Sequence, residues 1–402
     1  WTIGALFVTV IANAINKSIV WLPFGPAVDM VDYQVQTKFA DVNQTNDSLR
    51  LRHGKVYKLY ESTTTTTTEP AYMKGPETVL VNKKNGNKYV LTEEGMLVYL
   101  DETTTTASAS PHAYQTKVVP LVHLGVGRPL GGIVARDGTV YICDAVLGFM
   151  RVRNVHDPKC KPELIASRVK IPNGGNDGEE EYSPIILAND AAFGPKSGKI
   201  YFTDASSVPP DRVGVRTWDT LHASKIDYLR GIRSGRVFEY DPSTDKVTLI
   251  ASGMAYANGI AIGDPNKEDF LVVSETYAGR IVKIYLEPPS RRGDIELMVD
   301  APLPGYPDGM DCDYVSRNNN GQQQQHYYCY APMPSKGSPV GIFLVSTLPR
   351  VASRWLRSVF MALSRSIPVP IYKYGAVMEF DPKNGEITRI IQDPTGEDIH
   401  ML

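Results

Sequence analysis

One short pattern of polar and apolar positions recurs along the chain. In four segments an oxygen-bearing residue stands just before an apolar strand, and a second strand follows. A fifth copy, RPLGGIVARDGTVYICDAVLG, has Leu130 and Gly131 at that place. The four oxygen-bearing residues are Glu77, Asn189, Asn258 and Asp308.

This repeat predicts a β-propeller, because such units recurring about every 50–70 residues are typical of propeller blades. Blades are predicted to begin near residues 76, 128, 187, 256 and 306. The segments SGRVFEYDPSTDKVTLIASG and GAVMEFDPKNGEITRIIQDP repeat one alternating hairpin and are predicted to be outer strands. We expect an all-β six-bladed β-propeller over 76–402, with its last blade incomplete in this chain.

The start of each innermost strand faces the channel of a propeller, so the four special residues are predicted to meet there. They offer only oxygen ligands, a set that suits Ca²⁺ better than Mg²⁺. Two carboxylates would balance the charge of the ion. Each residue alone also suits an ordinary turn.

A second set of acidic residues recurs one strand later, in YICDA, YFTDAS and VVSET. For Asp144, Asp204 and Glu275 we predict a structural role, the capping of turns through backbone amides. The chain contains no GxSxG elbow and no P-loop, and its seven histidines show no metal-ligand spacing.

The N-terminus is apolar over residues 1–15 and is followed by Asn16 and Lys17. We interpret 1–22 as the remnant of a signal anchor or transmembrane segment, with upstream residues missing; an apolar strand packed on the propeller is the alternative. Residues 23–75 are predicted to be a connector with one outer strand. Sequons at Asn16, Asn43 and Asn46 fit a luminal or extracellular protein.

One late stretch has helical periodicity. Apolar residues recur every fourth position from Val351 to Leu363, and arginines fall mostly on the other side. Helix 349–365 is predicted to be a lid over the channel, a membrane-surface helix or a helix packed on a blade.

The net charge of −2 and the scattered basic residues exclude an electrostatic footprint for nucleic acid. Cys312 and Cys329 flank a polar insert, and would face each other if DCDYV and HYYCY pair as a hairpin. They are candidates for a disulfide, with two buried thiols as the alternative.

Several long motifs resemble the strictosidine synthase-like six-bladed propellers, among them LANDAAFGPKSGKIYFTDASS, ANGIAIGDPNKEDFLVVSETYAGRIVKIYL and LPGYPDGMD. The resemblance covers roughly 75–402. The wider superfamily includes paraoxonases and gluconolactonases, whose calcium ligands map onto the four residues named above. The resemblance to the strictosidine synthase-like group also implies a membrane-anchored glycoprotein with arylesterase-like activity. This chain departs from paraoxonases at Leu130 and Gly131, where they place a catalytic histidine.

These observations favour a calcium-dependent hydrolase of esters or lactones, with Asp308 as general base or nucleophile. The PDG at Pro307 to Gly309 is nearer the lactonase pattern than the PDN usual among synthase-like members. Two alternatives stay open. One is a strictosidine synthase-type condensing enzyme, whose last-blade glutamate falls beyond this chain. The other is a non-catalytic propeller, stabilised by calcium, that binds a partner.

Overall fold

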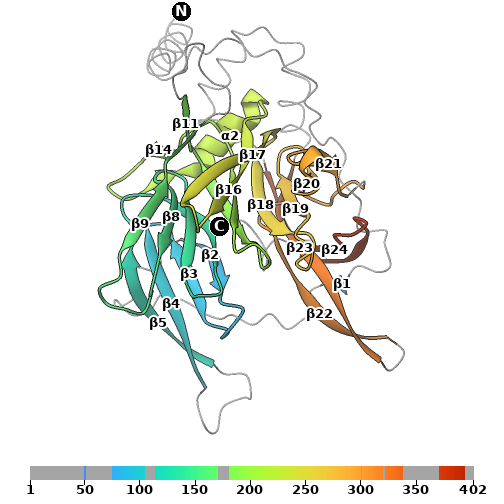
Figure 1. Ribbon diagram of the computed structural model, residues 1–402, viewed down its shortest axis with the longest axis horizontal. Coiled ribbons are helices and arrows are strands. Elements are labelled where there is room, and N and C mark those ends of the chain that lie inside the picture. Colours follow the sequence, from blue (N-terminus) through green and yellow to red (C-terminus); the bar gives the residue numbers. More distant parts are fainter. Residues whose placement is uncertain are drawn as a thin grey trace, which may run out of the picture.

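Five twisted antiparallel sheets make up most of the computed structural model of this chain (Figure 1). The structure describes residues 49–50, 75–104, 114–170, 181–299, 301–319, 322–337 and 371–393. The predicted anchor, the three sequons, helix 349–365 and most of the predicted connector lie outside the described residues. No helix among the described residues is long and apolar enough to cross a membrane.

Each sheet is one blade, and its strands follow one another in the sequence from the channel outward. The first blade contains β2 (Pro76–Val81), β3 (Lys88–Thr92), β4 (Met96–Thr104) and β5 (Tyr114–His123). The second contains β6 (Pro129–Val134), β7 (Val140–Asp144), β8 (Gly148–Val152) and β9 (Pro162–Ala166). A small ribbon of β10 (Arg168–Lys170) and β11 (Tyr182–Pro184) follows.

The third blade contains β12 (Ala188–Phe193), β13 (Ile200–Asp204), β16 (Gly235–Asp241) and β17 (Lys246–Met254). The fourth contains β18 (Ala257–Ile262), β19 (Phe270–Glu275), β20 (Arg280–Tyr285) and β21 (Ile295–Leu297), with the 3₁₀ turn η3 (Pro289–Arg291) before β21. The fifth contains β22 (Asp311–Asn319), β23 (Gln322–Gly337), β24 (Ile371–Phe380) and β25 (Ile387–Asp393). β1 (Leu49–Arg50) pairs with β25 in parallel.

The predicted blade starts are confirmed, and both predicted outer hairpins are present as β16–β17 and β24–β25. The predicted count of six blades is not, because the described residues form five. The sequence contains five copies of the two-strand unit. The sixth blade was inferred from the ring closure of propellers and from the family resemblance, and no further copy of the unit supported it.

The inner strands contact one another in the order β2, β6, β12, β18 and β22. Lys83, in the turn after β2, reaches the other end of this series. Its Nζ lies 3.2 Å from Asp311 Oδ1 and donates to the Cys312 carbonyl at 3.0 Å. Both side chains of this ion pair are largely exposed, so it adds little stability but brings the first and fifth blades together.

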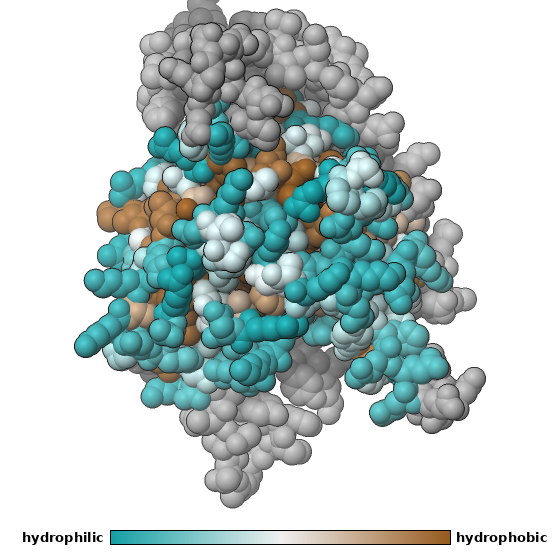
Figure 2. All heavy atoms as spheres, viewed as in Figure 1, coloured by the Kyte–Doolittle hydropathy of each residue, from teal (hydrophilic) through white to brown (hydrophobic). Residues whose placement is uncertain are grey.

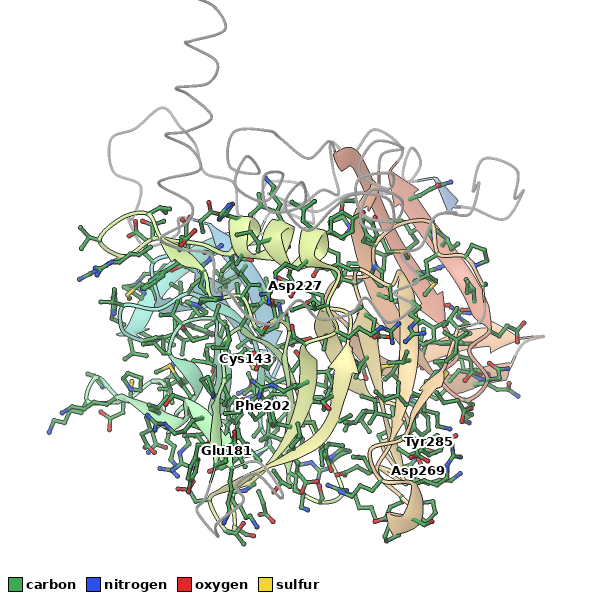
Figure 3. The ribbon with its side chains drawn as sticks, turned by 90° about the horizontal axis from the view of Figure 1, so that it is seen from above. Cys143, Glu181, Phe202, Asp227, Asp269 and Tyr285 are labelled. Carbon is green, nitrogen blue, oxygen red and sulfur yellow. A yellow bond between two sulfur atoms is a disulfide. The ribbon has the colours of Figure 1, made fainter. Side chains whose placement is uncertain are left out.

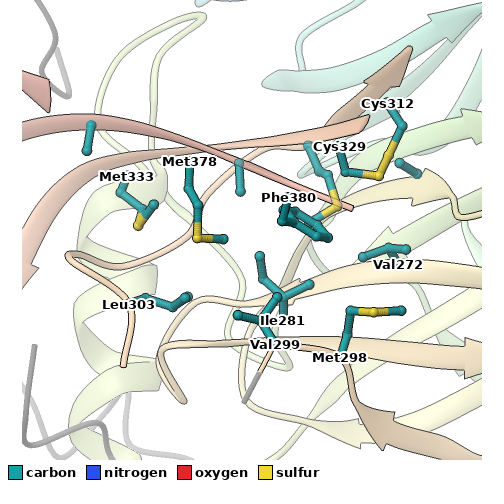
Figure 4. Packing of buried hydrophobic residues seen from close by; sticks show 14 of the residues in the cluster. Val272, Ile281, Met298, Val299, Leu303, Cys312, Cys329, Met333, Met378 and Phe380 are labelled. Atoms are coloured by element: carbon teal, nitrogen blue, oxygen red, sulfur yellow. A yellow bond between two sulfur atoms is a disulfide. The ribbon is translucent and has the colours of Figure 1, made fainter. Parts of the chain in front are cut away.

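The core lies between neighbouring blades, where apolar side chains from facing sheets interdigitate. Between the fourth and fifth blades, Val272 and Ile281 pack against Met378 and Phe380 (Figure 4). The predicted hairpin is confirmed, since Cys312 and Cys329 are paired across β22 and β23. In the structure a disulfide joins them at the edge of this cluster.

An insert between β13 and β16 was not predicted. It contains a short hairpin, β14 (Asp211–Arg212) and β15 (Trp218–Asp219), and the helix α2 (Thr220–Arg230). The sequence of α2 has no apolar stripe, since His222 and Asp227 are among its buried residues. Local signals define the helix instead: the Asp219 carboxylate caps its start, and Gly231 in the left-handed region ends it.

Asp227 holds α2 to the propeller through hydroxyl groups. Its carboxylate accepts a hydrogen bond from Ser206 at 2.6 Å and a longer one from Ser234 (3.4 Å), and it points from the helix toward the sheets (Figure 3). Burial raises the pKa of Asp227 to about 7, and only Arg230 and the two hydroxyls oppose the shift.

This raised pKa predicts a pH-dependent stability. The folded state holds the Asp227 proton up to about pH 7 and the unfolded state only to about pH 4, so unfolding becomes easier as the pH rises between them. Asp227→Asn keeps an oxygen for Ser206 and removes the charge. Relative to wild type we expect it to be unchanged near pH 4 and more stable at pH 7–8, by up to about 4 kcal/mol. Urea unfolding at several pH values checks this; a constant difference would contradict it.

Candidate functional site

A cavity of about 810 Å³ runs along the centre of the propeller, between the inner strands of all five blades. The four residues singled out by the repeat lie in its wall, together with Asp190. The structure therefore brings together side chains that are up to about 230 residues apart in the sequence. Leu130 and Gly131, from the copy without an oxygen ligand, line the same cavity.

The pairing register shifts at the start of each of the first four inner strands. The irregularity lies between Pro76 and Thr78 in β2, between Ala188 and Ala191 in β12, and between Ala257 and Ile260 in β18. β6 has a corresponding shift after Pro129. Such bulges turn side chains away from the strict alternation of a strand. They therefore position Glu77, Asn189, Asp190 and Asn258.

Asp308 lies in the segment before β22, against the bulge of β18. The Asn258 side-chain amide donates a hydrogen bond to Asp308 Oδ1. The backbones are also joined, because Gly259 N donates to the Asp308 carbonyl at 3.0 Å and Asp308 N donates to the Pro332 carbonyl at 2.9 Å. These bonds fix the Asp308 carboxylate at the cavity wall.

Asp190 is a site residue that the sequence did not identify. One carboxylate oxygen accepts from Ala191 N at 2.8 Å and the other from Ile260 N at 3.2 Å, across to β18. Thr203 adds a second link, since its hydroxyl donates to the Asn258 carbonyl at 2.7 Å. These two hydrogen bonds join the third and fourth blades next to the candidate ligands.

The two aspartates carry the unusual electrostatics of this site. Both lie deep in the protein and keep part of their surface open to the cavity. Burial raises the pKa of Asp190 to about 7 and also raises the pKa of Asp308, which Asn258 partly offsets. Among the ion pairs of the described residues, neither aspartate has a basic partner.

Glu77 is placed differently from the prediction. Its carboxylate forms an ion pair with the buried guanidinium of Arg128, which stands just before β6. Burial lowers the pKa of Arg128 to about 10, and its Nε and Nη1 have no hydrogen-bond partner among the residues that the structure describes. The negative charge of Glu77 is therefore already balanced by the Arg128 guanidinium of the neighbouring blade.

Gly131, in the copy that lacks an oxygen ligand, has no room for a side chain. A Cβ atom at Gly131 would stand 2.4 Å from the Asn189 carbonyl oxygen and 2.9 Å from Asp190 Oδ1. At Gly131 the third blade thus occupies the space that a side chain would need, so a histidine does not fit at this position. The side chain of Leu130 lines the cavity instead.

The second acidic set has the structural role that was predicted. Asp144 Oδ1 accepts backbone hydrogen bonds from Arg128, Val146 and Leu147 at 2.8–3.0 Å. Asp204 accepts from the amides of residues 186 and 187, and Glu275 accepts from the amide of residue 255. Each therefore ties the end of a second strand to the segment before its own inner strand.

No cluster of three or more His, Cys, Asp and Glu residues suited to a metal is found in the part of the chain that the structure describes. The oxygen donors at the channel nevertheless fit a divalent cation of the calcium type. Amide and carboxylate oxygens are its preferred ligands. Asp190 and Asp308 are two carboxylates with no basic partner among the described residues, and a divalent ion beside them would supply the missing positive charge.

The fold and site together define an all-β propeller with carboxylate and amide groups at its channel. The strictosidine synthase family profile matches residues 189–289 of this chain, which span the third and fourth blades. The resemblance found in the sequence is thereby confirmed.

Curated relatives support the same family. The chain is 28% identical over 281 residues to Protein STRICTOSIDINE SYNTHASE-LIKE 13 of Arabidopsis thaliana, covering 67% of this chain and 57% of that protein. It is 27% identical over 283 residues to adipocyte plasma membrane-associated protein of Homo sapiens, covering 67% and 56%. The chain thus spans little more than half the length of these two relatives.

Solved structures with a similar arrangement include a gluconolactonase from Xanthomonas campestris, with a TM-score of 0.43 and 14% identity, covering 80% of this chain and 77% of that one. A luciferin-regenerating enzyme gives a TM-score of 0.36 and 15% identity, covering 65% of this chain and 72% of that one.

Proposed function

We propose that this protein is a calcium-dependent hydrolase of esters or lactones. The observation that carries the proposal is the pair of carboxylates, Asp190 and Asp308, which face one cavity and have no basic partner among the described residues. Asn258 contacts Asp308, and Asn189 lines the same wall. Carboxylic esters and lactones share a polarised carbonyl, which a hard cation activates.

Asn189, Asn258, Asp190 and Asp308 would hold the ion, and Glu77 would join them only by giving up part of its contact with Arg128. When bound, calcium acts as a Lewis acid toward a carbonyl oxygen. The protein keeps this group of ligands in place through the hydrogen bonds between blades described above. The preformed arrangement limits the conformational change needed to bind a substrate.

Asp308 is the candidate catalytic residue. Its Oδ1 is engaged by Asn258, whereas its Oδ2 has no hydrogen bond to any described residue. Oδ2 is therefore available to accept a proton from water or to attack a carbonyl carbon as a nucleophile.

The proposal predicts that hydrolysis depends on calcium. Phenyl acetate and simple lactones should be hydrolysed by purified protein, and EDTA should abolish the reaction. Calcium should restore it better than magnesium, because the irregular set of oxygen donors suits the larger ion. Turnover that persists after complete removal of calcium would contradict the proposal.

The family match favours one second candidate, condensation of an amine with an aldehyde, because the matching profile is that of strictosidine synthase. The two reactions are distinguished by their products. Tryptamine and an aldehyde would be joined by a condensing enzyme through a new carbon–carbon bond to give a tetrahydro-β-carboline. A hydrolase would not form this product.

We further propose that the protein is anchored in a membrane by its N-terminal segment, with the propeller in the secretory lumen or outside the cell. The apolar residues 1–15 and the three sequons support this proposal. A mobility shift on treatment with an N-glycosidase tests it; a protein without N-glycans at any of the three sites would count against the luminal orientation.

A further inference from the structure

The β14–β15 hairpin presents an exposed apolar tip. Val213 and Val215 are 63% and 78% exposed, the two highest values among the large hydrophobic side chains of the described residues. Leu221, at the start of α2, is also exposed. Figure 2 shows apolar side chains at the left edge of the molecule, where Figure 1 draws the loop that begins at β14.

The backbone of this tip is hydrogen-bonded within the hairpin. Val213 N and Gly214 N donate to the Thr217 carbonyl at 3.0 and 3.2 Å. The Arg212 guanidinium donates to the carbonyls of Gly214 at 3.0 Å and Val215 at 2.6 Å. Polar backbone groups that are satisfied internally lower the free-energy cost of entering an apolar phase. The tip is thus preorganised with its valines pointing outward.

Positive charge accompanies the valines. Arg212 and Arg216 are exposed, and no carboxylate of the described residues forms an ion pair with either. Arg212 lies over the ring of Trp218, with 5.9 Å between its Cζ and the ring centroid. Apolar tips flanked by arginine and tryptophan suit the boundary between acyl chains and anionic headgroups.

The hairpin also lies at the functional end of the propeller. The insert leaves β13 at Asp204, which pairs with Ala188, and Ala188 precedes Asn189. Burial lowers the pKa of the His123 imidazole, at the end of β5, and the nearby charge of Arg216 lowers it further. The tip therefore extends from the third blade toward the first, at the end where the candidate ligands lie.

We propose that the β14–β15 tip docks this face of the propeller on an anionic lipid surface. The valines enter the acyl boundary while Arg212 and Arg216 remain at the headgroups. This contact is separate from any N-terminal anchor, and it directs the candidate site toward the membrane. It does not depend on the proposed hydrolase activity.

The test uses the full chain with an environment-sensitive label at position 215, as Val215→Cys in a Cys160→Ser background; the remaining free thiol, Cys143, is buried. Label at Leu164→Cys, on the outer strand β9, is the matched exposed site. With phosphatidylcholine vesicles that contain phosphatidylserine and spin-labelled lipid, quenching is expected at position 215 and not at 164. An N-terminal anchor alone would not produce this difference.

Variants separate the apolar and charged contributions. Val213→Asp is expected to weaken the apparent vesicle affinity reported by the label about tenfold, the effect of losing one buried valine. Arg216→Glu should reduce quenching only when phosphatidylserine is present. Leu297→Asp, at an exposed position on β21, is the matched control and should change nothing.

Two results would overturn the proposal. One is a label at position 215 that stays unquenched while the protein floats with the vesicles. The other is a signal from that label that changes with protein concentration when no vesicles are present. This result would show that the tip contacts a second copy of the chain.

Discussion

Asp308→Asn is expected to reduce hydrolysis of phenyl acetate by at least about 100-fold, the usual lower range for loss of a general base. The change removes one of the two unpaired charges at the cavity while keeping an oxygen next to Asn258. Calcium affinity should fall in the same variant, because the site loses a carboxylate ligand. Initial rates at saturating calcium separate the catalytic loss from the weaker binding.

Asp311→Asn is the matched control for this experiment. Asp311 lines the same cavity three residues further on, but it is exposed and paired with Lys83. The charge of Asp311 acts on Asp190, so its variant should keep the wild-type rate and change the calcium affinity much less than Asp308→Asn does. If Asp308→Asn changes stability and calcium affinity but leaves a measurable turnover intact, the ion has a structural role and the non-catalytic alternative is favoured.

Gly259→Ala is expected to lower the free energy of unfolding by about 1–3 kcal/mol, with loss of calcium affinity. A Cβ at Gly259 would lie 2.2 Å from the backbone carbon of Gly309 and 2.6 Å from the Asp308 carbonyl oxygen. Because these neighbours are backbone atoms, β18 and the segment around Asp308 must move apart. The bond from Gly259 N to Asp308 would weaken, and the carboxylate would lose its position.

Gly309→Ala provides a sharp comparison, since it adds the same methyl group on the other side of this contact. A Cβ at Gly309 would have no neighbour within 4 Å in the part of the chain that the structure describes. Its unfolding curve should match wild type to within about 0.5 kcal/mol. Equal destabilisation by the two glycine variants, measured by urea unfolding with and without calcium, would contradict the close approach at Gly259.

The parts of the fold that follow from a repeated pattern could be predicted from the sequence. Five blade starts, two outer hairpins and the turn-capping role of Asp144, Asp204 and Glu275 all rest on residues that recur at equivalent places. The same repeat predicted that the four candidate ligands would lie together, and all four line one cavity. It could not reveal α2, whose buried face includes His222 and Asp227 and therefore has no apolar periodicity.

Asp190 shows why the site itself could be predicted only in part. Successive side chains of a regular strand point to opposite faces, so Asn189 at the channel implies that Asp190 points away. The bulge in β12 removes this restriction, and both residues line the cavity. The ion pair between Glu77 and Arg128 could not be predicted from the sequence either, because the two residues lie on neighbouring blades and share no sequence motif.

We expect one calcium ion to bind at the end of the channel where Asn258 and Asp308 meet. Crystals grown with calcium, measured at a wavelength with anomalous signal from the ion, test it most directly. We expect a single peak that contacts Asp308 and lies next to Asp190, and that is absent in the Asp190→Asn, Asp308→Asn double variant. A channel that contains only water at saturating calcium, or an ion bound elsewhere, would contradict it.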